Sequence, residues 1–220
     1  MESKINYQKL LDQQLEVIKK NIAQGKEKPS LLLHACCGPC SSYVIEYLSN
    51  FFKITILYYN PNIHPEEEYQ RRLNELKNFL PRFPPAVQNN VKLVELEYNP
   101  QDFFEATNVL KEKELQTEAE KGERCRRCYK FRMQKAWEYA CKNNFDYFTT
   151  TLSISPYKDS KKLNDIGYTF DKIDKTNYLP ADFKKKGGFL RSTQISAEYG
   201  LWRQDYCGCI YSKQNSKKDY

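Results

Sequence analysis

The stretch that decides the fold is residues 31–42, which read LLLHACCGPCSS. Its apolar start, residues 31–33, is typical of a short buried strand. The Gly-Pro pair that comes after it predicts a turn. Ser41 and Ser42 are residue types that favour a helix N-cap, so we expect a helix to begin there.

Three cysteines, Cys36, Cys37 and Cys40, therefore lie where a buried strand gives way to a helix N-terminus. Backbone N–H groups and the positive end of the helix dipole favour the thiolate at such a position. The thiolate is the form that binds a metal or attacks an electrophile. Adjacent cysteines in a polar turn pack poorly as hydrophobic residues, so we interpret them as functional.

Length and composition fit one large domain: the chain has 220 residues, of which 40% are hydrophobic. Its N-terminus is polar and lacks the apolar segment of a signal peptide. No run of 18 apolar residues occurs, so we expect no membrane partner and a cytoplasmic protein. Thiols stay reduced there, and the eight cysteines then indicate metal or redox chemistry rather than a disulfide framework.

The positive charge is concentrated in two segments. Residues 121–135 hold seven basic residues and one acidic, and residues 184–218 hold eight basic and two acidic. Each segment has a net charge of +6, whereas the whole chain has only +7. Each also contains a cysteine pair, which favours a polyanionic partner, above all a nucleic acid, over two solvated faces.

Strand and helix patterns alternate along the chain. Strands are predicted at residues 31–33, 53–59, 91–98, 145–151 and 178–183, and helices at 7–24, 42–50, 65–80, 101–110, 124–144, 160–168 and 188–199. The alternation predicts an α/β fold, Rossmann-like or HUP-like, with a mostly parallel sheet covered by helices on both faces. Ligands bind beyond the carboxyl ends of such strands, so the loops at 36–40, 60–61 and 153–159 should meet at one metal site.

We expect three regions: an N-terminal amphipathic helix extension at residues 1–28, a single α/β catalytic domain at 29–212, and a polar, disordered tail at 213–220. Residues 111–122 are highly charged and are expected to form a mobile or helical excursion from the domain.

Four further cysteines form two close pairs, Cys125 with Cys128 and Cys207 with Cys209, whereas Cys141 stands alone and is interpreted as a core residue. Three local groups in one chain indicate a metal–thiolate centre. Zinc ribbons and fingers have little other structure, whereas iron–sulfur clusters are held by cysteine thiolates. A disulfide between two cysteines one residue apart would be strained and oxidising, which favours a redox or open-metal role for the last pair.

Five motifs together resemble the cobalamin-independent epoxyqueuosine reductases of the QueH type: HACCGPCSS, YNPNIHPEEEY, GERCRRCY, TLSISPYK and QDYCGCIYS. They occur in that order between residues 31 and 212. The resemblance implies an enzyme that reduces the epoxide of epoxyqueuosine at the wobble position of transfer RNA, which is the last step of queuosine synthesis. It also implies an external electron donor.

The same resemblance implies specific roles for the cysteines. A 4Fe–4S cluster is expected on Cys36, Cys37, Cys125 and Cys128. A redox-active, catalytic pair is expected at Cys207 and Cys209. The resemblance also allows a second, mononuclear iron, whose candidate ligands are Cys40, Cys207 and Cys209.

Removing an epoxide oxygen requires electrons, a group that polarises the C–O bond and an acid that protonates the oxygen. The candidate acids at the sheet edge are His64, Tyr157, Lys158, Asp159 and Asp205. His64 could equally end a turn, and Lys158 could contact phosphate. The residues expected to contact transfer RNA phosphates are Arg124, Arg126, Arg127, Lys130, Lys184, Lys185 and Lys186.

Two other classes are weighed against this interpretation. The first is an ATP-dependent transfer RNA thiolase, whose phosphate loop is rich in glycine and serine. Pro39 removes an N–H group from the corresponding turn, and one glycine makes a poor phosphate cradle. The second is a zinc-stabilised RNA-binding module without chemistry, which iron analysis of anaerobically purified protein would distinguish.

Overall fold

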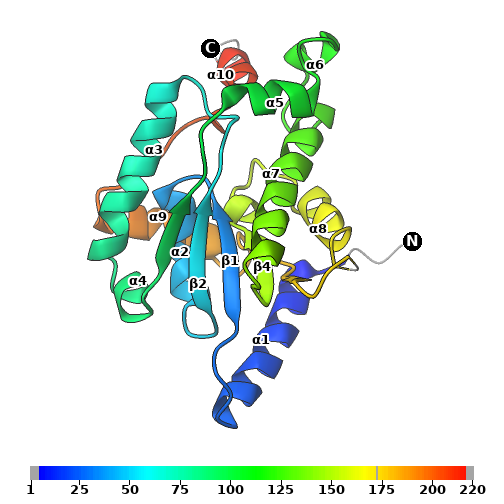
Figure 1. Cartoon of the computed structure of the whole chain (residues 1–220). Helices are drawn as coiled ribbons and strands as arrows, with labels where there is room; N and C mark the ends of the chain where they lie inside the picture. The colour runs from blue at the N-terminus through cyan, green and yellow to red at the C-terminus, as the bar shows by residue number, and fades with distance from the viewer. Residues whose placement is uncertain (1–4, 172, 217–220) are drawn as a thin grey trace.

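The computed structural model describes residues 5–171 and 173–216. Five parallel strands form one sheet in the order β3-β2-β1-β4-β5 (Figure 1). The strands are β1 Ser30–Ala35, β2 Lys53–Tyr58, β3 Lys92–Glu95, β4 Tyr147–Thr150 and β5 Asn177–Tyr178. The predicted fold class, a mostly parallel sheet with helices around it, is confirmed.

Helices connect the strands and surround the sheet (Figure 1). They are α1 Tyr7–Ala23, α2 Gly38–Leu48, α3 Glu66–Phe79, α4 Pro84–Gln88, α5 Pro100–Thr107, α6 Glu114–Thr117, α7 Glu123–Lys142, α8 Ser160–Tyr168, α9 Gly188–Glu198 and α10 Ile210–Ser216, with 3-10 turns at Leu80–Arg82 and Thr151–Ile154. Among the described residues, none of these helices is long and apolar enough to cross a membrane.

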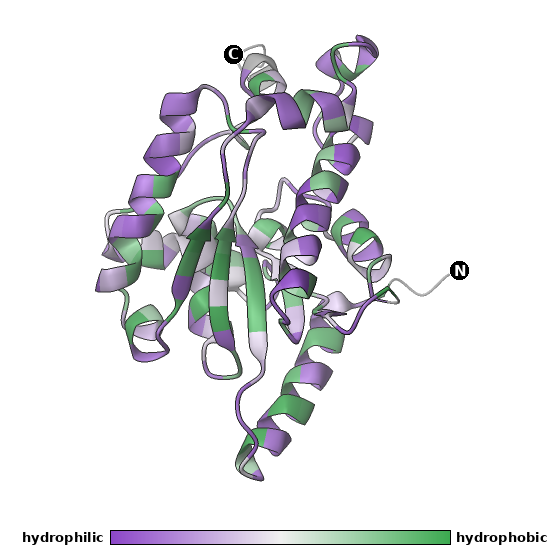
Figure 2. Cartoon of the chain, in the orientation of Figure 1, coloured by the Kyte–Doolittle hydropathy of each residue, from purple (hydrophilic) through white to green (hydrophobic). Residues whose placement is uncertain are grey.

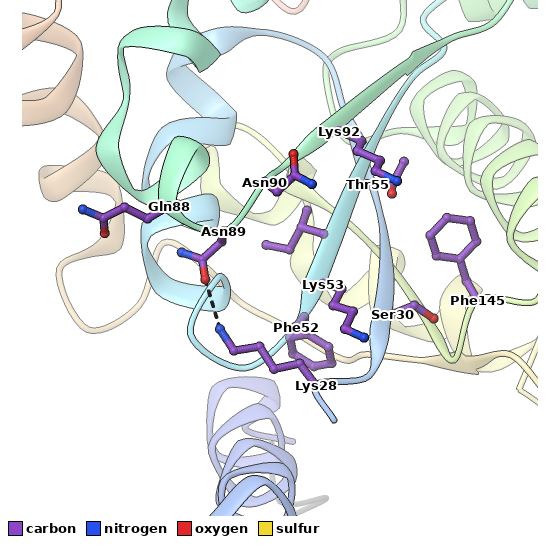
Figure 3. Close-up of a pocket in the computed structure, with 11 residues that line it drawn as sticks. Lys28, Ser30, Phe52, Lys53, Thr55, Gln88, Asn89, Asn90, Lys92 and Phe145 are labelled. Carbon is purple, nitrogen blue, oxygen red and sulfur yellow. Dashed lines mark hydrogen bonds between the residues drawn. The ribbon is translucent and has the colours of Figure 1, made fainter. Parts of the chain in front are cut away.

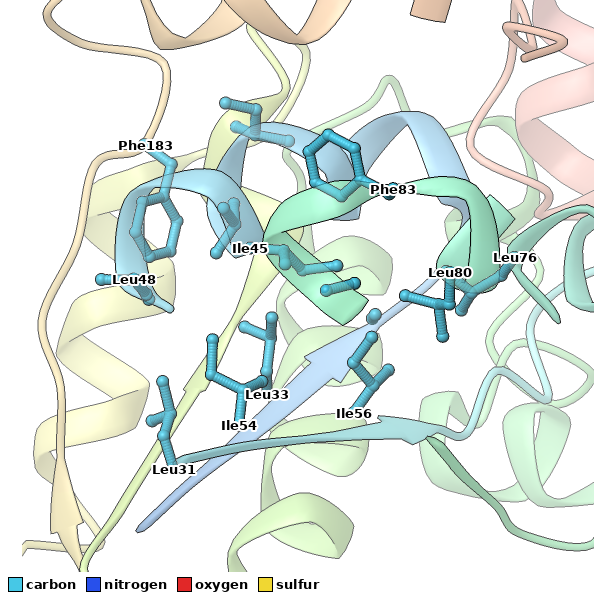
Figure 4. Packing of buried hydrophobic residues seen from close by; sticks show 14 of the residues in the cluster. Leu31, Leu33, Ile45, Leu48, Ile54, Ile56, Leu76, Leu80, Phe83 and Phe183 are labelled. Carbon is cyan, nitrogen blue, oxygen red and sulfur yellow. The ribbon is translucent and has the colours of Figure 1, made fainter. Parts of the chain in front are cut away.

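Alternate residues of the strands point to opposite faces of the sheet, and each face has its own core. Leu31 and Leu33 of β1 belong with Ile54 and Ile56 of β2 to a cluster that includes α2, α3 and α9 (Figure 4). Leu32 belongs to a second cluster with residues of α7 and α8. The central strands are accordingly mainly hydrophobic in Figure 2. This two-sided burial explains why residues 31–33 read as a continuous apolar run.

The helix at the N-terminus packs on the domain. Leu11, Leu15 and Ile18 are buried in the first of these clusters. The Tyr47 hydroxyl of α2 donates a hydrogen bond to Asp12 at 3.0 Å, and the Tyr7 hydroxyl donates to Asp165 of α8 at 3.1 Å. The apolar stripe read from the sequence therefore marks the face that α1 buries.

The structure corrects several expected boundaries. Strands β3 and β5 are shorter than expected, because the chain leaves the ladder after Glu95 and after Tyr178. The expected disorder of the tail is wrong for residues 213–216, which belong to α10, whereas residues 217–220 lie outside the described residues. The charged excursion at 111–122 contains the short helix α6.

Candidate metal and thiol site

The first thiol group lies between β1 and α2, at the carboxyl edge of the central strand. The sulfur atoms of Cys36, Cys37 and Cys40 all lie within 4.8 Å of one another, and those of Cys36 and Cys37 are 3.8 Å apart. Among the described residues, this is the one group of three or more potential ligand side chains that is so compact. Three sulfur donors at this spacing suit a thiophilic metal.

The helix after this turn begins earlier than predicted. Cys37 is the N-cap of α2, with extended backbone angles, and the Gly-Pro pair forms the first helical positions. The predicted N-caps Ser41 and Ser42 are instead inside the helix, where their hydroxyls donate to the carbonyls of Cys37 and Pro39. Proline suits a first helical turn because that turn has no use for its missing N–H. Cys36 consequently precedes the helix, Cys37 caps it and Cys40 lies in its first turn.

The second thiol group, Cys125 and Cys128, projects from the first turns of α7. Both residues are only 8% exposed. Cys125 and Cys128 are three positions apart along the helix, so they lie on the same face. Burial raises the pKa of Cys125 to about 11, and the negative charge of Cys207 adds to that effect. Cys128 shares its hydrophobic cluster with Cys209.

The third group, Cys207 and Cys209, lies in the loop before α10. Gly208 between them has a φ of +99°, a conformation that side-chain-bearing residues rarely adopt. The backbone N–H of His64 donates to the Gly208 carbonyl at 2.8 Å, which holds this loop against the segment after β2. A hydrogen bond from Cys209, followed by the positive charge of Lys158, holds the pKa of Cys207 well below its usual range.

Three buried cations link the thiol groups. Arg72 of α3 donates to the carbonyls of Cys207 and Tyr206, both at 3.3 Å, and is 1% exposed. Arg132 of α7 is 3% exposed. Hydrogen bonds from Cys37 and Cys40 hold the pKa of Cys36 low, and the positive charge of Arg132 adds to that effect. Burial raises the pKa of Cys128, and the charge of Arg132 opposes that rise. The three cysteine groups therefore face a single site at the carboxyl edge of the sheet.

Lys158 is the third cation, in the loop after β4, and its side chain is 9% exposed. Burial alone would lower its pKa, but the negative charges of Cys207, Tyr129 and Glu120 outweigh that effect and raise it. The Lys158 ammonium therefore stays charged next to Cys207.

The other candidate acids take different positions. Asp159 caps α8, where its carboxylate accepts the N–H of Lys162 at 3.1 Å. Asp205 is exposed, and Tyr157 is 68% exposed. The His64 ring stacks on Phe104 with centroids 5.2 Å apart, and burial lowers its pKa. Lys158 is the one of these side chains whose charge acts directly on a thiol group.

Of the three α7 arginines expected to contact phosphates, one is buried and two are paired with a glutamate. Arg124 is 2% exposed and donates to the carbonyls of Leu115 and Gln116, so its guanidinium is not available to a phosphate and that expectation is corrected. Arg126 and Arg127 both bind Glu123.

The remaining basic residues surround α8. Lys130 is exposed and lines a hollow between α7 and α8 together with Arg126 and Lys162. Lys184 donates to the Ser160 hydroxyl at 3.1 Å, at the start of α8, and to Asp182. Lys185 is exposed, and Lys186 binds Asp12 of α1 at 2.6 Å.

Sequence reasoning missed three side chains of the site: Arg72, Arg132 and Gln204. The Gln204 amide donates to the Cys37 sulfur at 3.1 Å. Arg132 lies four residues after Cys128, one turn along the same face of α7, and that spacing was the available clue. Cys141 was expected in the core but is only partly buried, near the far end of α7.

A second hollow lies at the opposite edge of the sheet, around the first residues of β1, β2 and β3 (Figure 3). Its lining includes Lys28, Lys53 and Lys92, and the Lys28 ammonium donates to Asn89 at 3.0 Å. None of the seven clustered cysteines lines it. It is therefore separate from the thiol site.

The number and placement of the thiols decide whether this site suits a metal. Seven thiols from three segments lie at the carboxyl edge of the sheet, and five of the seven are at most 8% exposed. Buried cations face them, as the negative charge of a metal–thiolate centre requires. The residues present therefore fit a metal held by cysteine sulfur.

Comparison with known proteins agrees with this arrangement. The family model described as epoxyqueuosine reductase QueH matches residues 31–215. A protein of that name from Streptococcus pyogenes serotype M1 is 41% identical over 209 residues, which cover 95% of this chain and 78% of the relative. One from Staphylococcus aureus strain Mu50 is 38% identical over 220 residues, covering 99% and 88%, and one from Haemophilus influenzae is 37% identical over 202 residues, covering 91% and 77%. By both the family match and these identities, the chain belongs to the QueH family.

Proposed function

We propose that this chain is an oxidoreductase that acts on transfer RNA, reducing the epoxide of epoxyqueuosine to give queuosine. The observation that carries the proposal is the meeting of three cysteine groups at one sheet edge in a chain of the QueH family. Neither a phosphate-binding loop nor a zinc finger requires a third group of thiols packed beside the second.

The first two cysteine groups are the proposed metal site. We assign a 4Fe–4S cluster to Cys36, Cys37, Cys125 and Cys128; when bound, it supplies electrons one at a time. Cys40 lies within 4.8 Å of both Cys36 and Cys37, so it competes with them as a ligand. The alternative role for Cys40, with Cys207 and Cys209, is a mononuclear iron next to the cluster.

The third group supplies the substrate chemistry. Removing the epoxide oxygen as water consumes two electrons and two protons. Oxidising the Cys207 thiolate and the Cys209 thiol to a disulfide supplies both electrons and one of the protons, and solvent supplies the other proton. Cys207 is the thiol poised to react, because Cys209 and Lys158 both stabilise its thiolate. A disulfide between cysteines one residue apart is strained, which eases its reduction by an external electron donor.

This scheme changes the roles of the candidate acids. One of its two protons comes from the Cys209 thiol and the other from solvent, so none of the other side chains has to supply one. The raised pKa of Lys158 makes its ammonium a poor proton donor. We therefore assign to Lys158 the task of holding the Cys207 thiolate. Asp159 acts as a helix cap, and the structure gives Asp205 and His64 no contact with a thiol.

The basic residues around α8 are the proposed transfer RNA surface. Lys130, Arg126 and Lys162 line the hollow between α7 and α8, and Lys184 lies at the start of α8. Lys158, directly before α8, reaches the thiols. A cationic surface that leads to the site suits the backbone of a single-stranded anticodon loop.

The experiment is metal analysis of cysteine variants. Cys36→Ala, Cys37→Ala, Cys125→Ala and Cys128→Ala, purified without oxygen, should each lose iron, sulfide and the reduced-state paramagnetic resonance. Cys141→Ala is the matched control and should keep all three, because Cys141 lies away from the other thiols. Zinc without sulfide in the unmodified protein would instead favour the RNA-binding module.

A further inference from the structure

One charged side chain of the site has no carboxylate to balance it. Arg132 is 3% exposed, and its guanidinium donates one hydrogen bond to the side-chain oxygen of Asn60. Its Nε–H, which is also buried, has no hydrogen-bond partner. Within the described part of the chain, no ion pair joins Arg132 to an aspartate or glutamate.

The other two buried cations of the site differ in this respect. Arg72 binds Glu68 at 2.7 Å, and the Lys158 ammonium lies 3.4 Å from Glu120. A buried charge without an opposite charge is costly, and an arginine cannot escape the cost by losing its proton. An arginine buried in this way indicates that an anion occupies the space that it faces.

The neighbours of Arg132 identify that anion. Through Asn60 the guanidinium is tied to the Ala35 carbonyl, directly before Cys36, and Cys128 lies one helical turn before Arg132 on the same face of α7. His34, whose ring nitrogens lie 2.8 Å from the Thr150 hydroxyl and 3.2 Å from the Tyr59 carbonyl, cannot supply the anion's charge, because a histidine is either neutral or positively charged. The negative charge therefore has to come from the sulfur atoms.

We propose that Arg132 is the counter-ion of the metal–thiolate centre, joining the cysteine group of the β1–α2 turn to that of α7 by charge and by its free N–H. The inference rests on the proposed function, since it needs a metal held by these two groups. Asn60 is the residue that positions the guanidinium: its amide donates to the Ala35 carbonyl at 2.9 Å, directly before Cys36, and its oxygen accepts from Arg132.

The test compares Arg132→Met, which keeps length but removes the charge, with Arg132→Lys, which keeps the charge but loses the planar fork. Arg127→Met is the matched control, because Arg127 lies on the same helix and its charge is balanced by Glu112 and Glu123. All proteins are full-length and purified without oxygen. The measurements are the rate of iron release to a chelator and the one-electron midpoint potential followed by paramagnetic resonance.

Arg132→Met should release iron at least tenfold faster than the unmodified protein. Its reduction should be at least tenfold less favourable, which for one electron is a midpoint about 59 mV lower, because the added electron loses a nearby positive charge. Arg132→Lys should lie between the two, and Arg127→Met should match the unmodified protein. If Arg132→Met matches it as well, the counter-ion proposal is wrong.

A second measurement covers the case in which Arg132→Met does not bind the metal. With the metal stripped from the full-length proteins, Arg132 faces only the charge of the free thiols, so Arg132→Met should lose no more resistance to urea than Arg127→Met does. Lower resistance would mean that Arg132 is only structural and would overturn the proposal. Absence of iron and sulfide from the unmodified protein would instead refute the proposed function, and so the two failures can be told apart.

Discussion

Replacing Gly208 by alanine should displace Cys207 and Cys209 and slow the reaction, while the metal stays bound. Gly208 lies between Cys207 and Cys209 with a φ of +99°. A Cβ added there would come within 2.8 Å of the Ile63 side chain and 3.2 Å of the Arg72 guanidinium. The loop must therefore move, and with it the Cys207 sulfur that Lys158 stabilises.

The cost follows from two separable effects. A residue with a Cβ at positive φ costs about 1–2 kcal/mol. Forcing a side chain into a packed contact typically adds about 1–3 kcal/mol. For a chain of this length, each kcal/mol lowers the melting temperature by about 2–4 °C. Gly208→Ala should therefore lower it by about 4–20 °C.

Gly200→Ala is the matched control. Gly200 also has a positive φ, +64°, but an added Cβ there meets nothing within 4 Å. It should cost only the backbone term of about 1–2 kcal/mol. The assays are thermal unfolding, iron content and the conversion of epoxyqueuosine in transfer RNA. Gly208→Ala should retain iron and convert at least tenfold more slowly, whereas Gly200→Ala should convert normally.

The reasoning would be refuted by a Gly208→Ala protein with the melting temperature of Gly200→Ala and unchanged conversion. That result would mean that the contacts with Ile63 and Arg72 relax without cost and that the loop geometry does not matter. Loss of iron from Gly208→Ala would also contradict the separation of the two thiol roles.

The remaining predictions concern helix α8 and the basic surface. Asp159→Asn should keep stability and conversion, because asparagine caps as well as aspartate, whereas Asp159→Ala should lose about 1 kcal/mol in a urea titration; slow conversion by the Asn variant would restore Asp159 as an acid. Lys130→Gln should lower the salt dependence of transfer RNA binding by about one unit of slope. Arg124→Gln should leave that slope unchanged and lower stability, since its guanidinium is buried. Charge reversal at Lys184 that changes neither affinity nor slope would exclude that residue from the surface.

The local patterns predicted the fold well where burial is two-sided. The apolar runs of β1 and β2 and the stripe of α1 were read correctly, because each buries whole faces. The ends of β3 and β5 were misjudged, because apolar residues there pack in loops instead of pairing. The tail after Ser212 was read as disordered from its polarity, whereas residues 213–216 continue the helix α10.

The candidate site could be predicted in its thiols but not in its charges. The grouping of the cysteines into three local sets can be read directly from the sequence. That these sets lie close together follows from the sheet topology. Whether an arginine is a surface contact or a buried counter-ion depends on packing between distant segments. Arg124 and Arg132 have the same residue type on the same helix as Arg126, yet both are buried.

The central claim is that one set of thiols holds the metal while Cys207 and Cys209 act on the substrate. The most direct measurement uses Cys207→Ser and Cys209→Ser, purified without oxygen, with iron and sulfide quantified and modified nucleosides then assayed from digested transfer RNA. The account predicts an intact metal centre, unchanged transfer RNA binding and epoxyqueuosine that persists. Loss of iron and sulfide from either variant would make that cysteine a ligand of the centre, and full conversion to queuosine would make the pair merely structural; either result would contradict the claim.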